Sequence, residues 1–206
     1  MSGVLDFLSP SLATDESGFH PVAHSAVTPL FRDADATFEE RDGWQVAVYV
    51  RGEADALRAV GVGDVSHLGK LEVRPAPNAL TGEGVVTYRI SPRRALVLFS
   101  ERERSTVRDQ VSRSDFVLDV TAAYTVLAVS GREARSLIAR LTHLHHFPSG
   151  GEVAHVTAHV LPAGDGFRVV VAQELGLYIA EVALDCARAL GGGLVGVDAL
   201  PGAERP

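Results

Sequence analysis

The sequence predicts an α+β fold in which antiparallel sheets carry helices. Short runs rich in β-branched residues recur along the chain from residue 44 onward, and three or four amphipathic segments interrupt them. Their order approximates a repeated strand–strand–helix–strand unit. This recurrence indicates two ferredoxin-like halves.

Length, composition and charge limit the classes of protein to which the chain can belong. The 206 residues fit one compact domain, and a hydrophobic share of 46% can build a core without disulfides. The single cysteine, Cys186, cannot form an internal disulfide, which is typical of a cytoplasmic protein. A net charge of −7 argues against nucleic-acid binding. No run approaches 18 apolar residues, and Asp6 stands where a signal peptide carries basic charge, so we expect no membrane segment and no secretion.

The chain is predicted to begin with an extended arm, residues 1–35, followed by one domain, residues 36–206. Pro10 and Pro21 interrupt any periodic pattern in the arm. Such a segment buries too little to order itself, so we expect it to wrap the domain or contact a partner.

The first elements of the domain are a strand and a helix. Residues 44–51 are rich in β-branched and aromatic side chains, which predicts a strand. Residues 53–60 are predicted to be helical because Ala56, Ala59 and Val60 share one face.

The stretch from residue 60 to residue 73 predicts strand, tight turn, strand. Gly63 and Gly69 would relieve backbone strain at the bends. Four polar side chains crowd the turn: Asp64, Ser66, His67 and Lys70. They could form a catalytic group or hold the turn together. Because Asp and Ser routinely bond the amides of a turn, the structural interpretation is favoured.

The next elements are a hairpin and a charged helix. Strands at residues 85–90 and 95–99 are expected to pair across the turn at residues 91–94. Residues 101–112 indicate a surface helix whose charges face solvent.

The second half repeats strands and helices. Strands are predicted at residues 116–120, 124–129, 153–161 and 167–172. Ser130 is expected to cap a helix over residues 131–141. Residues 173–190 form the longest predicted helix, which residues 191–193 end as a glycine C-cap before a last strand. Its expected buried stripe comprises Leu175, Tyr178, Ile179, Val182, Cys186, Ala189 and Leu190.

Two groups of residues could bind a metal or act in catalysis. A histidine cluster comprises His143, His145, His146, His155 and His159. Imidazoles can bind metals, but no carboxylate or cysteine completes a site, so we favour a polar loop and predict no metal. Glu83, between two glycines, could act as a base or hold a cation in a cleft. A solvated hairpin loop is the favoured alternative, and no other catalytic residue is predicted.

Several motifs resemble those of the aminomethyltransferase family, which includes the glycine cleavage T-protein and the related halves of sarcosine and dimethylglycine oxidases. Residues 60–73 are similar to its "VG-x-x-DVSH-x-GK-x-EV" segment, and residues 28–31 to its "TPL". Tyr88-Arg89 resembles the end of its "VYR" strand, and Gly166-Phe167 resembles "DGFE". The resemblance implies the folate-binding domain of that family, without its C-terminal barrel.

Departures from the family matter for function. The catalytic carboxylate that precedes the "VYR" strand is missing, which leaves Glu83 as the candidate for a displaced base. Ser100 replaces an asparagine. The glutamate that holds the pterin in "TGYTGE" is absent from residues 161–165. Of the folate-contacting positions, Tyr88 is kept, so the resemblance makes Tyr88 the candidate cofactor-binding residue.

A short chain without the catalytic residues most resembles the gamma subunit of heterotetrameric sarcosine oxidase. The resemblance implies a non-catalytic accessory subunit with larger partner subunits that carry the folate domain and the flavin and nicotinamide cofactors (FAD, FMN, NAD). No cofactor is then expected on this chain. The alternative is a stand-alone tetrahydrofolate-dependent aminomethyltransferase or demethylase. An iron–sulfur-assembly relative is disfavoured because Cys186 lies on a helix stripe, where it indicates core packing.

Overall fold

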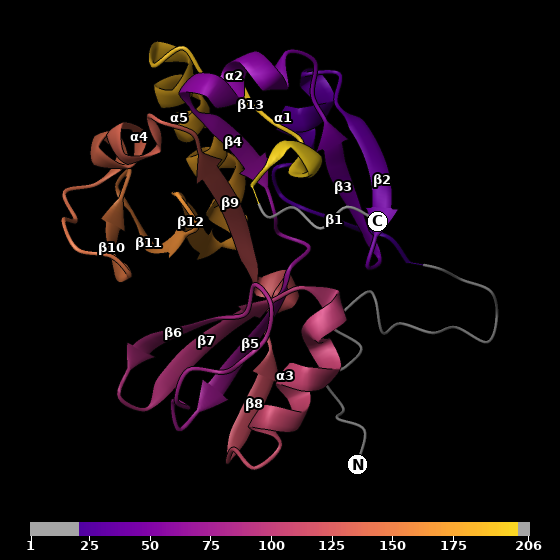
Figure 1. The fold of residues 1–206 in the computed structure, drawn as a ribbon, viewed down its shortest axis with the longest axis vertical. Helices are drawn as coiled ribbons and strands as arrows, with labels where there is room; N and C mark the ends of the chain where they lie inside the picture. The colour runs from indigo at the N-terminus through magenta and orange to yellow at the C-terminus, as the bar shows by residue number, and fades with distance from the viewer. Residues whose placement is uncertain (1–20, 202–206) are drawn as a thin grey trace.

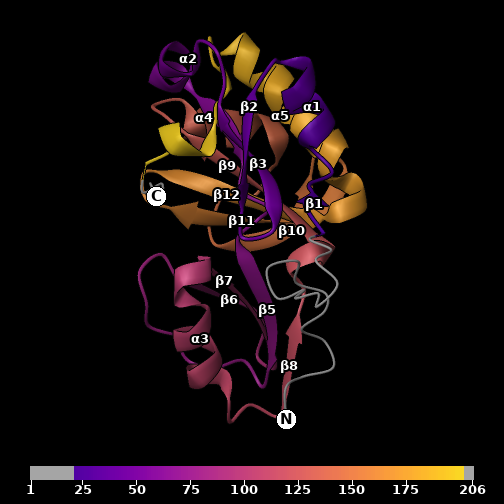
Figure 2. The same ribbon diagram turned by 90° about the vertical axis from the view of Figure 1, so that its right-hand side faces the viewer.

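The computed structural model describes residues 21–201, which form a larger and a smaller lobe (Figures 1 and 2). The larger lobe holds a six-stranded sheet of β10 (Ser149–Val153), β11 (Val156–Ala163), β12 (Gly166–Ala172), β9 (Tyr124–Ser130), β4 (Gly61–Asp64) and β13 (Gly193–Leu194), in that order. It also holds a three-stranded sheet of β1 (Ala23–His24), β3 (Trp44–Tyr49) and β2 (Thr37–Arg41). The smaller lobe holds a four-stranded sheet of β6 (Val86–Ser91), β7 (Arg94–Phe99), β5 (Gly69–Arg74) and β8 (Phe116–Asp119).

Most strand pairs are antiparallel. The parallel pairs among the described strands are β1 with β3 and β13 with β4. No described sheet closes into a barrel. The predicted α+β class with antiparallel sheets is therefore confirmed. No helix within residues 21–201 is both long and apolar enough to cross a membrane.

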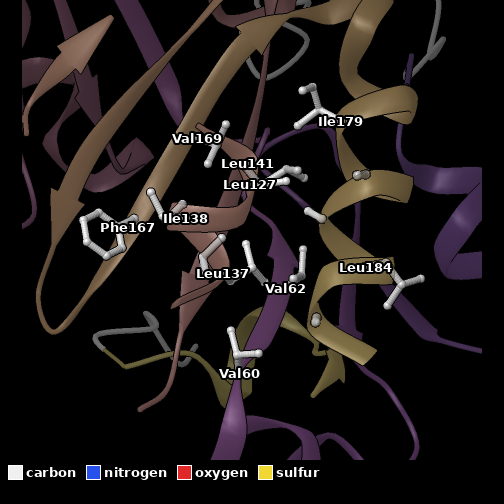
Figure 3. Close-up of a cluster of buried hydrophobic side chains, with 14 of the residues drawn as sticks. Val60, Val62, Leu127, Leu137, Ile138, Leu141, Phe167, Val169, Ile179 and Leu184 are labelled. Carbon is white, nitrogen blue, oxygen red and sulfur yellow. The ribbon is translucent and has the colours of Figure 1, made fainter. Parts of the chain in front are cut away.

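The main core lies between the six-stranded sheet and two helices, α4 (Ala134–Leu141) and α5 (Gly176–Ala189) (Figure 3). Alternate strand residues such as Leu127 and Val169 point to this face, because successive side chains of a strand face opposite ways. Ile138 and Ile179 meet them from the helices.

The opposite face of the six-stranded sheet contributes to a second core. Val126 and Val170 pack there with Trp44 of β3 and with Leu96 and Leu98 of β7. The other face of the four-stranded sheet packs on α3 (Arg104–Val111) to form a third core. The two lobes are thus joined by apolar packing as well as by the chain.

The chain crosses between the lobes at the stretch from residue 60 to residue 73. The two predicted strands exist as β4 and β5, but they do not pair with each other. β4 pairs with β9, whereas β5 pairs with β7 and β8. The glycines there permit close packing instead of relieving strain. A Cβ on Gly69 would lie 2.4 Å from the Phe99 ring, and one on Gly63 would lie 3.0 Å from Leu200.

The helical predictions need some correction. α2 (Glu53–Ala59) and the glycine that ends α5, Gly191 with φ +81°, are confirmed. The expected cap by Ser130 is wrong, because α4 begins at Ala134 with no side-chain cap. The charged segment forms η3 (Glu101–Glu103) and α3, and three of its side chains are buried: Arg104, Val107 and Val111.

The buried face of α5 is built from small residues. It comprises Gly176, Ile179, Ala180, Ala183, Leu184 and Ala187, whereas the predicted stripe included Tyr178, which is 40% exposed. A Cβ on Gly176 would lie 2.2 Å from Thr125 Oγ1 of β9. The glycine and the three alanines therefore let the helix approach the sheet closely, and Tyr178 faces outward.

The predicted N-terminal arm is partly folded. Residues 1–20 of it lie outside the described residues. Residues 28–33 form α1 (Thr28–Asp33) instead of an extended segment, with a proline in its first turn. Val27 and Phe31 are buried in the main core, so these residues belong to the domain.

Candidate functional site

A cavity of about 900 Å³ lies between the two lobes and is the candidate functional site. The larger lobe contributes the β2–β3 turn, the end of β9 and the β11–β12 turn, and the smaller lobe contributes the segments before β6 and after β7. Its lining comprises residues 39–42, 65, 67, 68, 83–86, 100–102, 128–130, 162–165, 167, 168, 197, 200 and 201. A space of this size suits a drug-sized ligand.

Arg168 of β12 brings a positive charge into the cavity wall. It lies on the face of the sheet turned away from α4 and α5, opposite Ala128 of β9. Its Nη1 is buried and has no hydrogen-bond partner among residues 21–201. Burial lowers the pKa of the guanidinium, yet an arginine stays protonated at neutral pH.

His67 lines the same cavity. Burial, together with the positive charges of Lys70, Arg41 and Arg168, lowers the pKa of its imidazole to about 3. His67 is therefore neutral near pH 7. In that form it offers one donor and one acceptor.

The other polar groups of the turn hold it in shape, as the structural interpretation predicted. Asp64 Oδ1 accepts a bond of 3.0 Å from the Ser66 amide, and the Ser66 hydroxyl donates to the same carboxylate. Ser66 Oγ also accepts a bond of 3.0 Å from the Val126 amide of β9. Lys70 Nζ donates to the carbonyls of Ser66 and Leu68, at 2.7 and 2.8 Å.

Lys70 is expected to make stability depend on pH. Its side chain is fully buried, and burial lowers its pKa from 10.5 to about 7. At pH values between about 7 and 10.5, Lys70 is protonated more in the unfolded chain than in the folded chain. The free energy of unfolding should therefore rise with pH, by up to about 1.4 kcal/mol per pH unit. Urea unfolding at pH 7, 8 and 9 measures this rise.

The chain has one lysine, which makes this test direct. In protein labelled with ¹³C-lysine, the single signal should titrate near pH 7, and Lys70→Met should flatten the pH dependence of unfolding. A lysine signal that titrates near pH 10 would contradict the account.

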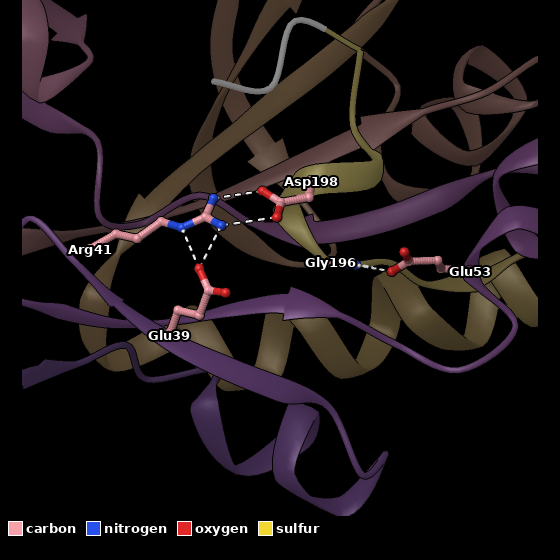
Figure 4. A network of polar contacts seen from close by, with 5 residues as sticks. All are labelled: Glu39, Arg41, Glu53, Gly196 and Asp198. Carbon is pink, nitrogen blue, oxygen red and sulfur yellow. Dashed lines mark hydrogen bonds and ion pairs between the residues drawn. The ribbon is translucent and has the colours of Figure 1, made fainter. Parts of the chain in front are cut away.

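An arginine-centred network holds the wall that η6 (Val197–Ala199) forms (Figure 4). Arg41 donates to both carboxylate oxygens of Asp198, at 2.6 and 2.9 Å, and to Glu39. The bonds to Asp198 are the main cause of the raised pKa of Arg41. The Gly196 amide donates to Glu53 of α2 at 2.9 Å. These bonds tie η6 to β2 and α2.

The predicted site residues are not brought together as a catalytic group. Glu83 lies at the cavity edge, exposed, with no hydrogen bond or ion pair within residues 21–201. Ser100 lines the cavity, and its buried hydroxyl has no partner there. Tyr88 is buried but does not line the cavity. Its ring lies on His159, with centroids 5.1 Å apart.

The histidines are dispersed. His143, His145 and His146 are exposed before β10, and His155 lies in the β10–β11 turn with φ +66°. The strand predicted over residues 153–161 is β11, which begins at Val156, and β10 precedes it as its hairpin partner. Within residues 21–201, no three metal-ligating side chains lie together.

Residue patterns alone missed Arg168. One signal was present, because this arginine interrupts the apolar run of β12, Phe167 to Ala172. Charged residues are almost never buried unless they are paired. A lone arginine in a buried strand therefore marks a position to examine.

Comparison with solved structures gives two matches to the fold. Aminomethyltransferase T of the glycine cleavage system from Bartonella henselae matches with a TM-score of 0.66 and 16% sequence identity, over 86% of this chain and 60% of that chain. A chain of heterotetrameric sarcosine oxidase from Corynebacterium sp. U-96 matches with a TM-score of 0.57 and 16% identity, over 84% of this chain and 98% of that chain.

No family model and no curated protein sequence matches the chain. The chain spans less than two thirds of the aminomethyltransferase but nearly all of the sarcosine oxidase chain. The fold expected from the sequence resemblance is confirmed. The chain therefore has the α+β fold shared by glycine cleavage aminomethyltransferase T and a chain of heterotetrameric sarcosine oxidase.

Proposed function

We propose that this chain is a non-catalytic accessory subunit, similar to the sarcosine oxidase gamma subunit, of a flavin- and folate-linked amine oxidase or dehydrogenase. The observation that carries the proposal is the match to 98% of a chain from a heterotetrameric enzyme. The larger partner subunits hold the flavin and the folate domain.

The cavity chemistry supports this proposal. The aminopyrimidine edge of a pterin presents several hydrogen-bond donors, and a carboxylate pairs well with them. The wall of this cavity includes the guanidinium of Arg168, which has no acceptor, and the neutral imidazole of His67, which has one. Of the carboxylates in its lining, Glu40, Asp42, Glu83 and Asp165 are exposed, and the half-buried Glu101 accepts a bond from Arg104. The residues present therefore do not fit a buried pterin.

The setting of Glu83 also favours an accessory role. A general base must lie within hydrogen-bond reach of the proton it removes, in a fixed orientation. Glu83 lies between Gly82 and Gly84, whose φ angles are +148° and +70°, and no described residue orients its carboxylate. Its loop therefore lacks the fixed geometry of a catalytic site.

An accessory subunit should depend on its partners for stability. Expressed without them, the chain is expected to unfold at a lower temperature than in the complex, because partners that bind only the folded state stabilise it. Thermal unfolding of the isolated and the assembled chain measures this. Equal unfolding temperatures would argue against the proposal.

The second candidate function is a stand-alone tetrahydrofolate-dependent transferase or demethylase. The observation that favours it is the cavity, whose volume of about 900 Å³ suits a ligand of drug size. Here Glu83 would be the base, so Glu83→Gln should abolish activity and leave the unfolding temperature unchanged. The accessory role predicts that the same variant leaves the activity of the complex unchanged. Titration with a reduced folate is the companion test, and saturable binding by the isolated chain would favour the transferase.

A further inference from the structure

We propose that the cavity between the lobes binds an amphipathic monocarboxylate, whose carboxylate pairs with Arg168. This inference is independent of the accessory role. It concerns what the cavity holds, whatever larger assembly the chain enters.

The first support is the unsatisfied guanidinium. A buried donor without a partner is costly, and few persist in native proteins. Nη1 of Arg168 is such a donor within residues 21–201. Arg168 is part of the cavity lining, and this end of its guanidinium has no hydrogen bond within residues 21–201 to give up on meeting a ligand. Arginine pairs with carboxylates through two parallel hydrogen bonds, so a carboxylate is the natural partner.

The second support is the local charge. Arg41, which also lines the cavity, is already neutralised by Asp198 and Glu39. His67 is neutral, because burial is the main cause of its depressed pKa and the positive charges of Lys70, Arg41 and Arg168 add to it. The charge of Arg168 is thus left uncompensated next to His67. Ser100 adds a buried hydroxyl that can donate a hydrogen bond.

The rest of the lining selects the kind of carboxylate. Apolar side chains face much of the cavity: Val65, Leu68, Val86, Phe167, Val197 and Leu200. They suit an apolar body. The exposed carboxylates at the edge repel additional negative charge. A ligand with one carboxylate and an apolar body therefore fits better than phosphate or a dicarboxylate.

Arg168 also reverses the charge of the resembled motif. The segment from Asp165 to Arg168 reads Asp-Gly-Phe-Arg, where the motif reads Asp-Gly-Phe-Glu. A guanidinium at this position favours anions, and a carboxylate would favour donors.

A matched pair of probes tests the proposal. Benzoate and benzamide have nearly the same shape, but only benzoate is charged. Titrated into the full chain and followed by calorimetry or NMR, benzoate should bind about tenfold or more tightly than benzamide. Phthalate, with two carboxylates, should bind more weakly than benzoate. Equal binding of benzoate and benzamide, or tighter binding of phthalate, would overturn the proposal.

Substitutions of Arg168 test whether this residue causes the preference for benzoate over benzamide. Arg168→Gln should reduce benzoate binding to the level of benzamide, and Arg168→Lys should keep a preference for benzoate. Arg93→Gln is the matched control, because Arg93 is exposed and lies outside the cavity lining. A benzoate preference that survives in Arg168→Gln would contradict the assignment.

A measurement on the protein without substitutions avoids the risk that a variant loses binding because it misfolds. At pH 7 benzoate is ionised, and bound beside Arg168 it lies close to His67. Saturating benzoate should therefore shift the His67 ring signals, and benzamide at the same concentration should shift them less. NMR of the ring signals at pH 7 measures this, and equal shifts with the two probes would overturn the proposal.

Discussion

Replacing Gly196 with alanine is expected to destabilise the protein by about 3 kcal/mol or more. A Cβ at this position would lie 2.1 Å from the Val48 carbonyl oxygen and 2.4 Å from the Tyr49 amide nitrogen. Both atoms belong to the backbone of β3, which cannot move aside as a flexible side chain can. The substitution would push η6 away from β3 and disturb the wall of the cavity.

Gly193 provides the matched control for Gly196→Ala. A Cβ on Gly193 would lie 3.5 Å from the Ala56 side chain, an ordinary contact distance. Gly193→Ala should therefore change the unfolding temperature little. Gly196→Ala should lower it by about 6–12 °C, which calorimetry can resolve. Similar unfolding temperatures for the two variants would contradict the packing described for η6.

Ser66→Ala is expected to cost about 3 kcal/mol. Its hydroxyl is the buried link between Asp64 and the Val126 amide. Without it, a buried amide loses its acceptor and a buried carboxylate loses a donor, and such losses cost about 1–3 kcal/mol each. Since His67 follows directly, the cavity should also be disturbed.

Chemical denaturation measures the effect of Ser66→Ala. Ser105→Ala is the control, because Ser105 is exposed on α3. The control should change the free energy of unfolding by less than about 0.5 kcal/mol. If Ser66→Ala were as mild as the control, the turn would not depend on this hydroxyl.

Local elements could be predicted from the sequence, but sheet membership could not. The β6–β7 hairpin follows from two apolar runs around a Ser91–Arg94 turn, and these residues are close in the chain. β4 and β5 are also close in the chain, yet they pair with strands of different sheets. Their partners depend on packing between distant segments, which a local pattern does not encode.

The β10–β11 turn escaped prediction for a conformational reason. Ala154 and His155 have φ angles of +46° and +66°, values that two-residue hairpin turns usually assign to glycine or asparagine. The alternating pattern of small and polar residues continues across the turn without a break. The sequence therefore indicated one strand.

The cavity could be predicted only in fragments. The motifs pointed to Glu83 and to the turn around His67, and both line it. Arg168, Arg41 and Ser100 come from three other segments, and only the fold brings them together. Tyr88 matches a motif of the resembled family, yet it lies outside the cavity lining. A match to a motif therefore did not by itself place a residue in the cavity.

The accessory role is tested most directly by native mass spectrometry of the tagged chain, purified gently from its own host. The proposal predicts that the chain arrives with larger flavin-bearing chains in a fixed ratio. Dissociation of that complex should release this chain without bound flavin. A chain that arrives alone, or as a homodimer, would contradict the accessory role and make the folate titration and Glu83→Gln the decisive experiments.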